Sequence, residues 1–115
     1  MTYKVGIIGA GTVVKNMHLP ALNGIPNVEI RGIANRNIEK AKILSKWYKI
    51  PYVYQNYEEL LQTDIDVVHI CTPAFTHRNI VMDCAKYKKH ILIEKPFCLT
   101  TKEAGEMLTE AKKKD

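Results

Sequence analysis

The sequence KVGIIGAGTVVKNMHLPAL, residues 4–22, is the starting point for interpreting this chain. An apolar run at positions 5–8 leads into a glycine turn, which is followed by residues compatible with a helix. In a dinucleotide-binding loop, the first glycine makes a tight turn after a strand and the second lets the backbone approach a pyrophosphate. Gly9 and Gly11 occupy these two positions, whereas Val14 stands where a third glycine is usual.

The glycine turn has the properties expected of a phosphate-binding loop. Phosphates bind at the amino end of a helix, where free N–H groups and the positive end of the helix dipole favour anions. Thr12 adds a hydroxyl donor at this point. Val14 is expected to affect the packing of helix against strand more than the phosphate contact. A glycine-rich turn without a ligand is the alternative interpretation.

The length and composition correspond to one soluble globular domain over residues 1–115, with 46% hydrophobic and 25% charged residues. No apolar run approaches the roughly 18 residues needed to span a bilayer. The N-terminus reaches strand-like sequence by Tyr3 and lacks the pattern of a signal peptide. We therefore expect a cytoplasmic protein that has no membrane partner.

The cysteines and the charge distribution restrict the function further. Cys71, Cys84 and Cys98 are odd in number and have no CxxC spacing, which argues against a disulfide framework and against a metal site. The net charge of +5 comes largely from lysines at positions 86, 88, 89 and 112–114, which solvated helix ends explain. Because aromatic and basic residues are not interleaved, we do not expect nucleic acid as a partner.

Strand-like and helix-like segments alternate along the whole chain. Apolar, β-rich runs predict strands at residues 3–8, 28–34, 52–54, 67–71 and 90–93. Apolar residues repeat at helical spacing over 38–48 and 80–85, and capping-box spacing at Thr100 predicts a last helix from about Thr101. This alternation predicts the α/β class, with a doubly wound parallel sheet of the Rossmann type and helices on both faces.

The end of the second predicted strand bears on the choice of cofactor. An acidic residue at this place would bind the ribose hydroxyls of NAD and repel the 2′-phosphate of NADP. Here Asn35, 24 positions after Gly11, is neutral, and Arg36 offers a planar charged fork suited to phosphate. The pair predicts an NAD(P) cofactor with a preference for NADP. An exposed arginine in a turn is the alternative interpretation of Arg36.

Two later segments place polar residues where strands end. In DVVHICTPAFTH, residues 66–77, the carboxyl end of a strand brings Thr72, Pro73 and His77 to the edge where open α/β sheets bind ligands. In HILIEKPF, residues 90–97, two opposite charges and a proline follow a buried strand. Three other histidines are expected to be structural. His69 and His90 are assigned this role by their strand positions, and His18 by capping or packing, because Pro20 breaks or kinks the helix there.

Four segments in order, GIIGAGTVVKNMHLPAL, IANRN, DVVHICTPAFTH and HILIEKPFCLT, resemble the N-terminal domain of the glucose-fructose oxidoreductase, inositol dehydrogenase and rhizopine-catabolism (Gfo/Idh/MocA) family. The resemblance implies that Lys95 lies near the nicotinamide and takes part in proton transfer, and that Glu94 and Pro96 shape that end of the site. A lysine can serve in this way when burial or neighbouring charge lowers its pKa; an ion pair with Glu94 is the alternative. The other positions that match the family's cofactor contacts are Gly9, Gly11, Thr12, Val13, Thr72, Pro73 and His77.

The resemblance also implies an activity. It predicts the NAD(P)-binding domain of a dehydrogenase that transfers hydride between the cofactor and a secondary alcohol or ketone of a sugar, cyclitol or related polyol. The family's second domain, which carries the remaining catalytic residues and most of the oligomer surface, has no counterpart in this sequence. We therefore expect cofactor binding with little turnover from the chain alone, and a homo-oligomeric full-length protein. A non-catalytic NAD(P) sensor is the alternative function.

Overall fold

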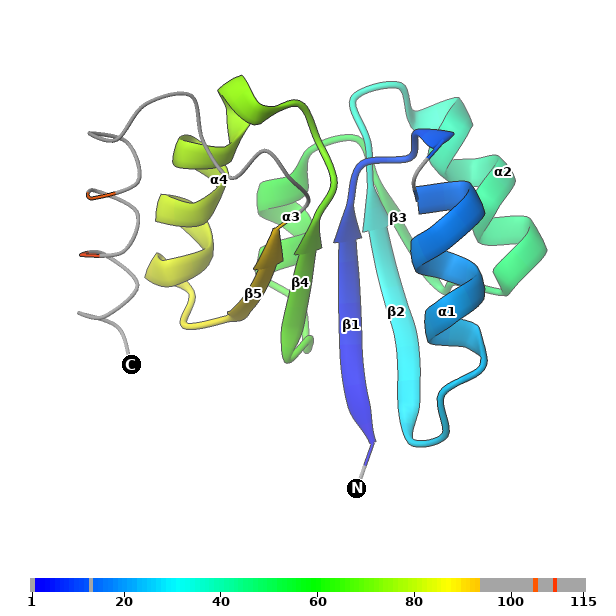
Figure 1. Ribbon diagram of the computed structural model, residues 1–115. Helices are drawn as coiled ribbons and strands as arrows, with labels where there is room; N and C mark the ends of the chain where they lie inside the picture. The colour runs from blue at the N-terminus through cyan, green and yellow to red at the C-terminus, as the bar shows by residue number, and fades with distance from the viewer. Residues whose placement is uncertain (1, 13, 94–104, 106–108, 110–115) are drawn as a thin grey trace.

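The computed structural model describes residues 2–12, 14–93, 105 and 109, and its centre is a parallel sheet. Five strands lie in the order β3-β2-β1-β4-β5, and each neighbouring pair is parallel (Figure 1). The strands are β1 (Tyr3–Ile8), β2 (Val28–Ala34), β3 (Tyr52–Tyr54), β4 (Val67–Ile70) and β5 (His90–Ile93). The predicted strands are thus confirmed, except that β4 ends one residue earlier than expected.

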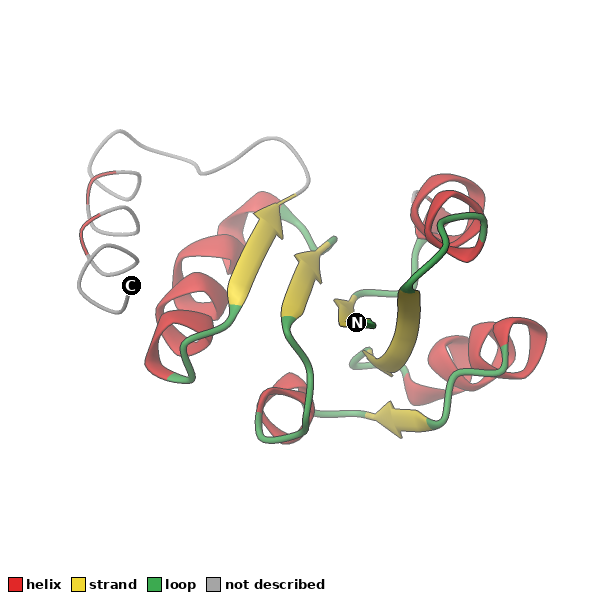
Figure 2. Cartoon of the chain, turned by 90° about the horizontal axis from the view of Figure 1, so that it is seen from below, coloured by secondary structure: helices red, strands yellow, loops and turns green. Residues whose placement is uncertain are grey.

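Helices cover both faces of this sheet. They are a π-helical turn η1 (Val14–His18), then α1 (Leu19–Asn23), α2 (Ile38–Tyr48), α3 (Tyr57–Leu61) and α4 (Ala74–Lys86). Seen along the strands, α1 and α2 lie on one side of the sheet and α3 and α4 on the other (Figure 2). The predicted doubly wound α/β fold is confirmed. The last helix, predicted from about Thr101, lies outside the described residues.

Each face of the sheet has its own apolar core, because neighbouring residues of a strand point to opposite faces. Ile7 belongs to the core under α1 and α2, and Ile8 to the core under α3 and α4. Val14, at the position of the usual third glycine, is fully buried in the first core. Burying a valine side chain contributes about 1.5–3 kcal/mol. Val14 therefore fills space between the first helical segment and the sheet.

Pro20 explains the irregular start of the first helix. A proline has no N–H donor, and its ring collides with the carbonyl group four residues earlier in a regular α-helix. The chain forms a π-helical turn over Val14–His18, and α1 begins at Leu19 with Pro20 in its first turn. The helical break predicted at Pro20 is therefore present as a change of helix type.

The helix α3 was not predicted, since five residues are too few to show helical periodicity. Its amino end is capped by Asn56, whose side chain accepts a hydrogen bond of 2.9 Å from the backbone N–H of Glu58. Leu60 of this helix lies over Gly6 and Gly32, which are paired residues of β1 and β2. A Cβ atom at Gly32 would lie 2.4 Å from Leu60 Cδ1. The absence of side chains at the two glycines therefore allows α3 to pack closely against the sheet.

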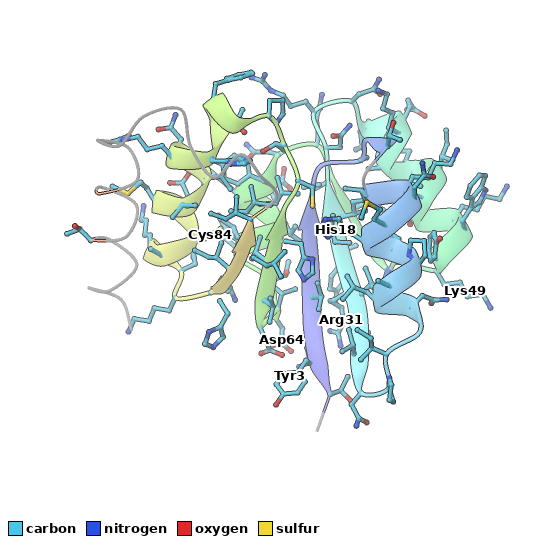
Figure 3. All side chains as sticks on the ribbon, viewed as in Figure 1. Tyr3, His18, Arg31, Lys49, Asp64 and Cys84 are labelled. Carbon is cyan, nitrogen blue, oxygen red and sulfur yellow. The ribbon has the colours of Figure 1, made fainter. Side chains whose placement is uncertain are left out.

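Charged side chains gather at the opposite end of the sheet from the strand carboxyl ends. Lys4 Nζ lies 2.5 Å from Asp64 Oδ2, and Arg31 pairs with Glu29 (Figure 3 labels Asp64 and Arg31). The Lys4 ammonium lowers the pKa of the Asp64 carboxyl through its hydrogen bond and its charge. The Asp64 carboxylate is exposed, whereas the Arg31–Glu29 pair is partly buried. None of these four residues lines the pocket described below.

Candidate functional site

A pocket of about 460 Å³ opens at the carboxyl ends of β1 and its neighbours β2 and β4. The chain leaves β1 toward β2 on one side and later returns to β4 on the other, so this is the point where the strand order reverses. Ligands of open α/β sheets bind at such a point. The pocket is lined by Ile8, Gly9, Ala34, Asn35, Arg36, Gln55, Tyr57, Thr72, Pro73, Phe75, Thr76, Asn79 and Ile80.

Gly9 has a backbone conformation that only glycine adopts easily. Its φ is +115°, and an added Cβ atom would lie 2.7 Å from the carbonyl oxygen of Cys71. Its N–H group donates to the carbonyl oxygen of Ala34 at 2.8 Å. Gly9 therefore makes the tight turn that the sequence predicts and joins the ends of three strands.

Gly11 differs from Gly9, because no described part of the chain requires a glycine there. Its φ is not positive, and an added Cβ atom would meet no atom of the described residues within 4 Å. Its carbonyl oxygen accepts the first helical hydrogen bond, from the N–H of Lys15 at 3.0 Å. The residue thus leaves open space at the amino end of the first helical segment, which fits a pyrophosphate that must approach the backbone closely. Thr12 is exposed beside it.

The turn after β2 is held by backbone and side-chain hydrogen bonds. The N–H of Asn35 donates to the carbonyl of Tyr54 at 3.0 Å, and Asn35 Nδ2 donates to the carbonyl of Asn37 at 2.8 Å. Gln55 Nε2 donates to the carbonyl of Arg36 at 3.1 Å. Asn35 and Arg36 both line the pocket, and their contact with the ribose end of a dinucleotide stays a prediction.

The turn after β4 contains three of the predicted positions. Thr72 and Pro73 line the pocket, and the hydroxyl groups of Thr72 and Thr76 are hydrogen-bonded at 2.6 Å. His77 is fully buried, and its Nε2 lies 2.8 Å from the carbonyl oxygen of Thr72. The ring is not part of the pocket wall and contacts the backbone of the turn at Thr72. A direct contact of His77 with a cofactor stays a prediction.

A pair of histidines links the first helical segment to the sheet. His18 Nδ1 and His69 Nδ1 lie 3.1 Å apart, and the two rings meet edge to face with centroids 5.3 Å apart (Figure 3 labels His18). Burial lowers the pKa of His69, and the neighbouring His18 lowers it further. The pair packs the end of η1 against β4, as expected for structural histidines. His90 is the first residue of β5 and is exposed.

Tyr57 closes the pocket on the side of α3 and α4. Its hydroxyl donates a hydrogen bond to Asp83 Oδ2, which joins the two helices. Burial, followed by this bond to a carboxylate, raises the pKa of Tyr57 well above its usual range. Tyr57 therefore remains neutral at physiological pH and acts as a fixed part of the wall.

The structure brings together the predicted residues Gly9, Asn35, Arg36, Thr72 and Pro73 in one pocket. Gly11, Thr12 and His77 lie outside the pocket lining. Val13, Glu94, Lys95 and Pro96 lie outside the described residues.

Sequence reasoning did not identify several pocket residues. Gln55 directly follows β3, so the rule that ligands bind at strand carboxyl ends could have identified it. Phe75 and Asn79, like Thr76 and Ile80, stand four residues apart on α4, and they belong to the pocket because of how α4 lies on the sheet. Nothing in their local sequence distinguishes them from other helical residues.

The described residues form neither a candidate metal site nor a candidate membrane-spanning helix. No group of three or more histidine, cysteine, aspartate or glutamate side chains is arranged there to hold a metal ion. None of the helices in that part of the chain has the length and apolar content needed to cross a membrane. Cys71 is half-buried, whereas Cys84 is buried, and burial raises the pKa of the Cys84 thiol to about 12. Cys98 lies outside the described residues.

Comparison with known proteins gives relatives over nearly the whole chain. Trans-1,2-dihydrobenzene-1,2-diol dehydrogenase of Xenopus tropicalis is 36% identical over 116 residues, covering 98% of this chain and 35% of that protein. Myo-inositol 2-dehydrogenase of Thermotoga maritima is 28% identical over 113 residues, covering 97% of this chain and 34% of that protein. The chain thus spans about one third of the length of these curated relatives.

The same relationship holds in three dimensions. The 3-ketoreductase KijD10 from Actinomadura kijaniata, whose crystal structure is in complex with TDP-benzene and NADP, superposes with a TM-score of 0.92 at 28% identity, covering 99% of this chain and 36% of that one. The model of the oxidoreductase family with an NAD-binding Rossmann fold matches residues 3–115. This chain therefore belongs to the Gfo/Idh/MocA family of oxidoreductases and comprises its NAD-binding Rossmann domain.

Proposed function

We propose that this chain binds NAD(P), with a preference for NADP, as part of a dehydrogenase that acts on a secondary alcohol or ketone of a sugar, cyclitol or related polyol. Hydride transfer is the chemistry that the nicotinamide supplies when bound. The described residues bind and orient the cofactor. The named activities of the relatives, on inositol and on a dihydrodiol, support the class of substrate.

The single observation that carries the proposal is the combination of Gly9 and Gly11 beside the pocket. Gly9 turns the chain at the end of β1, and Gly11 leaves room at the amino end of a helical segment. The pocket extends from this turn to Arg36 after β2 and to Pro73 after β4. A dinucleotide bound across the switch point would place its phosphates by the glycines and its adenosine end by Arg36.

The preference for NADP is supported by the chemistry around Arg36. The described wall of the pocket carries no aspartate or glutamate that could bind both ribose hydroxyls or repel a 2′-phosphate. The guanidinium group is permanently charged and suited to phosphate. The related ketoreductase was crystallised with NADP, which agrees with this preference.

A titration with NADPH and NADH, followed by nicotinamide fluorescence, tests the proposal. We expect NADPH to bind more tightly, and Arg36→Ala to reduce this preference about ten-fold or more, since hydrogen bonds to charged groups contribute about 1.5–3 kcal/mol. Lys40→Ala, on the exposed part of α2, removes one positive charge and serves as the matched control. Equal affinity for both cofactors would contradict the NADP preference, and no binding of either would contradict the whole proposal.

For catalysis, we propose that Lys95 transfers a proton to or from the substrate hydroxyl, with Glu94 and Pro96 shaping the nicotinamide end of the site. We further propose that residues 1–115 form the cofactor-binding unit of a cytoplasmic homo-oligomer whose substrate pocket is completed by a further domain. The one-third coverage of the relatives supports this division. In a full-length protein, Lys95→Ala should abolish hydride transfer while cofactor binding persists; unchanged turnover would remove Lys95 from the catalytic residues.

A further inference from the structure

The turn that carries Arg36 is held from the neighbouring strand by the side chain of Gln55. Gln55 follows β3, and its Nε2 donates a hydrogen bond of 3.1 Å to the carbonyl oxygen of Arg36. The two residues are 19 positions apart and both line the pocket. The side chain of Gln55 therefore fixes the backbone from which the Arg36 side chain extends.

The side chain of Asn35 does not connect this turn to the neighbouring strand. Its Nδ2 group donates to the carbonyl of Asn37 within the same turn, at 2.8 Å. That bond shapes the turn internally, whereas the bond from Gln55 ties the turn to the rest of the sheet. A second tie, from the N–H of Asn35 to the carbonyl of Tyr54, uses backbone atoms only. Gln55 is thus the side chain that connects the Arg36 backbone to the β3 end.

We propose that Gln55 is a positioning residue for cofactor specificity, which holds Arg36 so that its guanidinium group meets the 2′-phosphate of NADP. The inference rests on the proposed preference for NADP. Arginine is long and exposed here, and it must lose rotamer freedom to bind phosphate. Fixing the backbone of Arg36 in advance reduces the conformational entropy that is lost when the ligand binds. The bond from Gln55 therefore contributes to NADPH binding and much less to NADH binding.

Two variants of Gln55 test this inference, with the ratio of NADH to NADPH dissociation constants as the readout. Gln55→Ala removes the donor, and we expect the preference for NADPH to fall about two- to ten-fold, the range for one neutral hydrogen bond. Gln55→Glu removes the donor and adds a negative charge beside the pocket, so the preference should fall further. Gln62→Ala, at the exposed end of α3, is the matched control and should leave the ratio unchanged.

A double-mutant cycle separates positioning from direct contact. If Gln55 acts through Arg36, then Gln55→Ala has no further effect on the ratio when Arg36→Ala is already present. An equal effect in both backgrounds would show that Gln55 contacts the ligand directly and would overturn the positioning role. Because Gln55 is exposed, urea denaturation should give the same midpoint for Gln55→Ala as for the starting protein.

The remaining outcomes distinguish the two proposals. A starting protein that prefers NADPH and a Gln55→Ala variant with the same preference would overturn the inference and leave the NADP proposal standing. Equal affinity of the starting protein for NADH and NADPH would overturn the NADP preference, and the role of Gln55 with it. Loss of the preference in Gln55→Ala, dependent on Arg36, is the supporting result.

Discussion

Gly9 and Gly11 allow the fold and the ligand to be tested separately, because the structure gives the two glycines different surroundings. At Gly9 the backbone has a φ of +115°, and a Cβ atom would lie 2.7 Å from the backbone oxygen of Cys71. At Gly11 the φ is not positive, and among the residues that the structure describes a Cβ atom would meet nothing within 4 Å. Alanine at position 9 therefore strains the protein, whereas alanine at position 11 occupies only the space that we assign to phosphate.

The expected changes in stability and in NADPH affinity follow from the surroundings of the two glycines. Gly9→Ala combines a backbone conformation that costs about 1–3 kcal/mol with a collision against main-chain atoms, so we expect a loss of roughly 2–4 kcal/mol in the free energy of unfolding. Gly11→Ala should change stability by less than about 1 kcal/mol, and it can stabilise by restricting the unfolded chain. Its methyl group would keep phosphate from the backbone N–H groups, each worth about 1.5–3 kcal/mol, so NADPH should bind about ten- to a hundred-fold more weakly.

Urea denaturation and NADPH fluorescence titration on the same preparations measure both effects. Gly24→Ala is the control, since Gly24 ends α1 with a φ of −91° and its Cβ would meet the nearest atom at 3.8 Å. We expect this variant to bind NADPH like the starting protein. If Gly11→Ala binds NADPH with unchanged affinity, the space at Gly11 does not hold the phosphates. A stable Gly9→Ala variant would contradict the strain at that turn.

Three further predictions concern packing and protonation. Gly32→Ala should lower the free energy of unfolding by about 1–3 kcal/mol, because its Cβ atom would lie 2.4 Å from Leu60 Cδ1. Adding Leu60→Ala to the same chain should recover part of this loss, and additive effects of the two substitutions in denaturation would refute the contact. Burial, followed by the electrostatic effect of the neighbouring His18, lowers the pKa of His69 below its usual value of 6.5. The unfolded chain therefore binds more protons, and the free energy of unfolding should fall as pH drops from 7 to 5. This loss should be smaller in His69→Gln, and an unchanged pH dependence would refute the assignment. His77→Ala should lower the free energy of unfolding by about 2–4 kcal/mol and weaken NADPH binding, because the fully buried ring and its 2.8 Å hydrogen bond to the β4–α4 turn are lost. An unchanged melting temperature would contradict this role.

The elements that could be predicted from sequence are those with a local cause. The strands are runs of apolar and β-branched residues, and the glycine turn lies at the end of the first one. The same rule, that ligands bind at strand carboxyl ends, identified Arg36 and Pro73, because position relative to a strand can be read along the chain. The break at Pro20 also has a local cause, the missing N–H group.

The tertiary structure decided the features that depend on which segments become neighbours. The helix α3 has five residues, and its place is set by Leu60 lying over the paired glycines Gly6 and Gly32. The bond from Gln55 to Arg36 exists because β3 lies next to β2. The amino-acid sequence alone determined the strands, the helices with a clear apolar repeat and the glycine turn, since these depend on residues close together in the chain. The order of the strands and the contacts between neighbouring strands were decided only by the folded sheet.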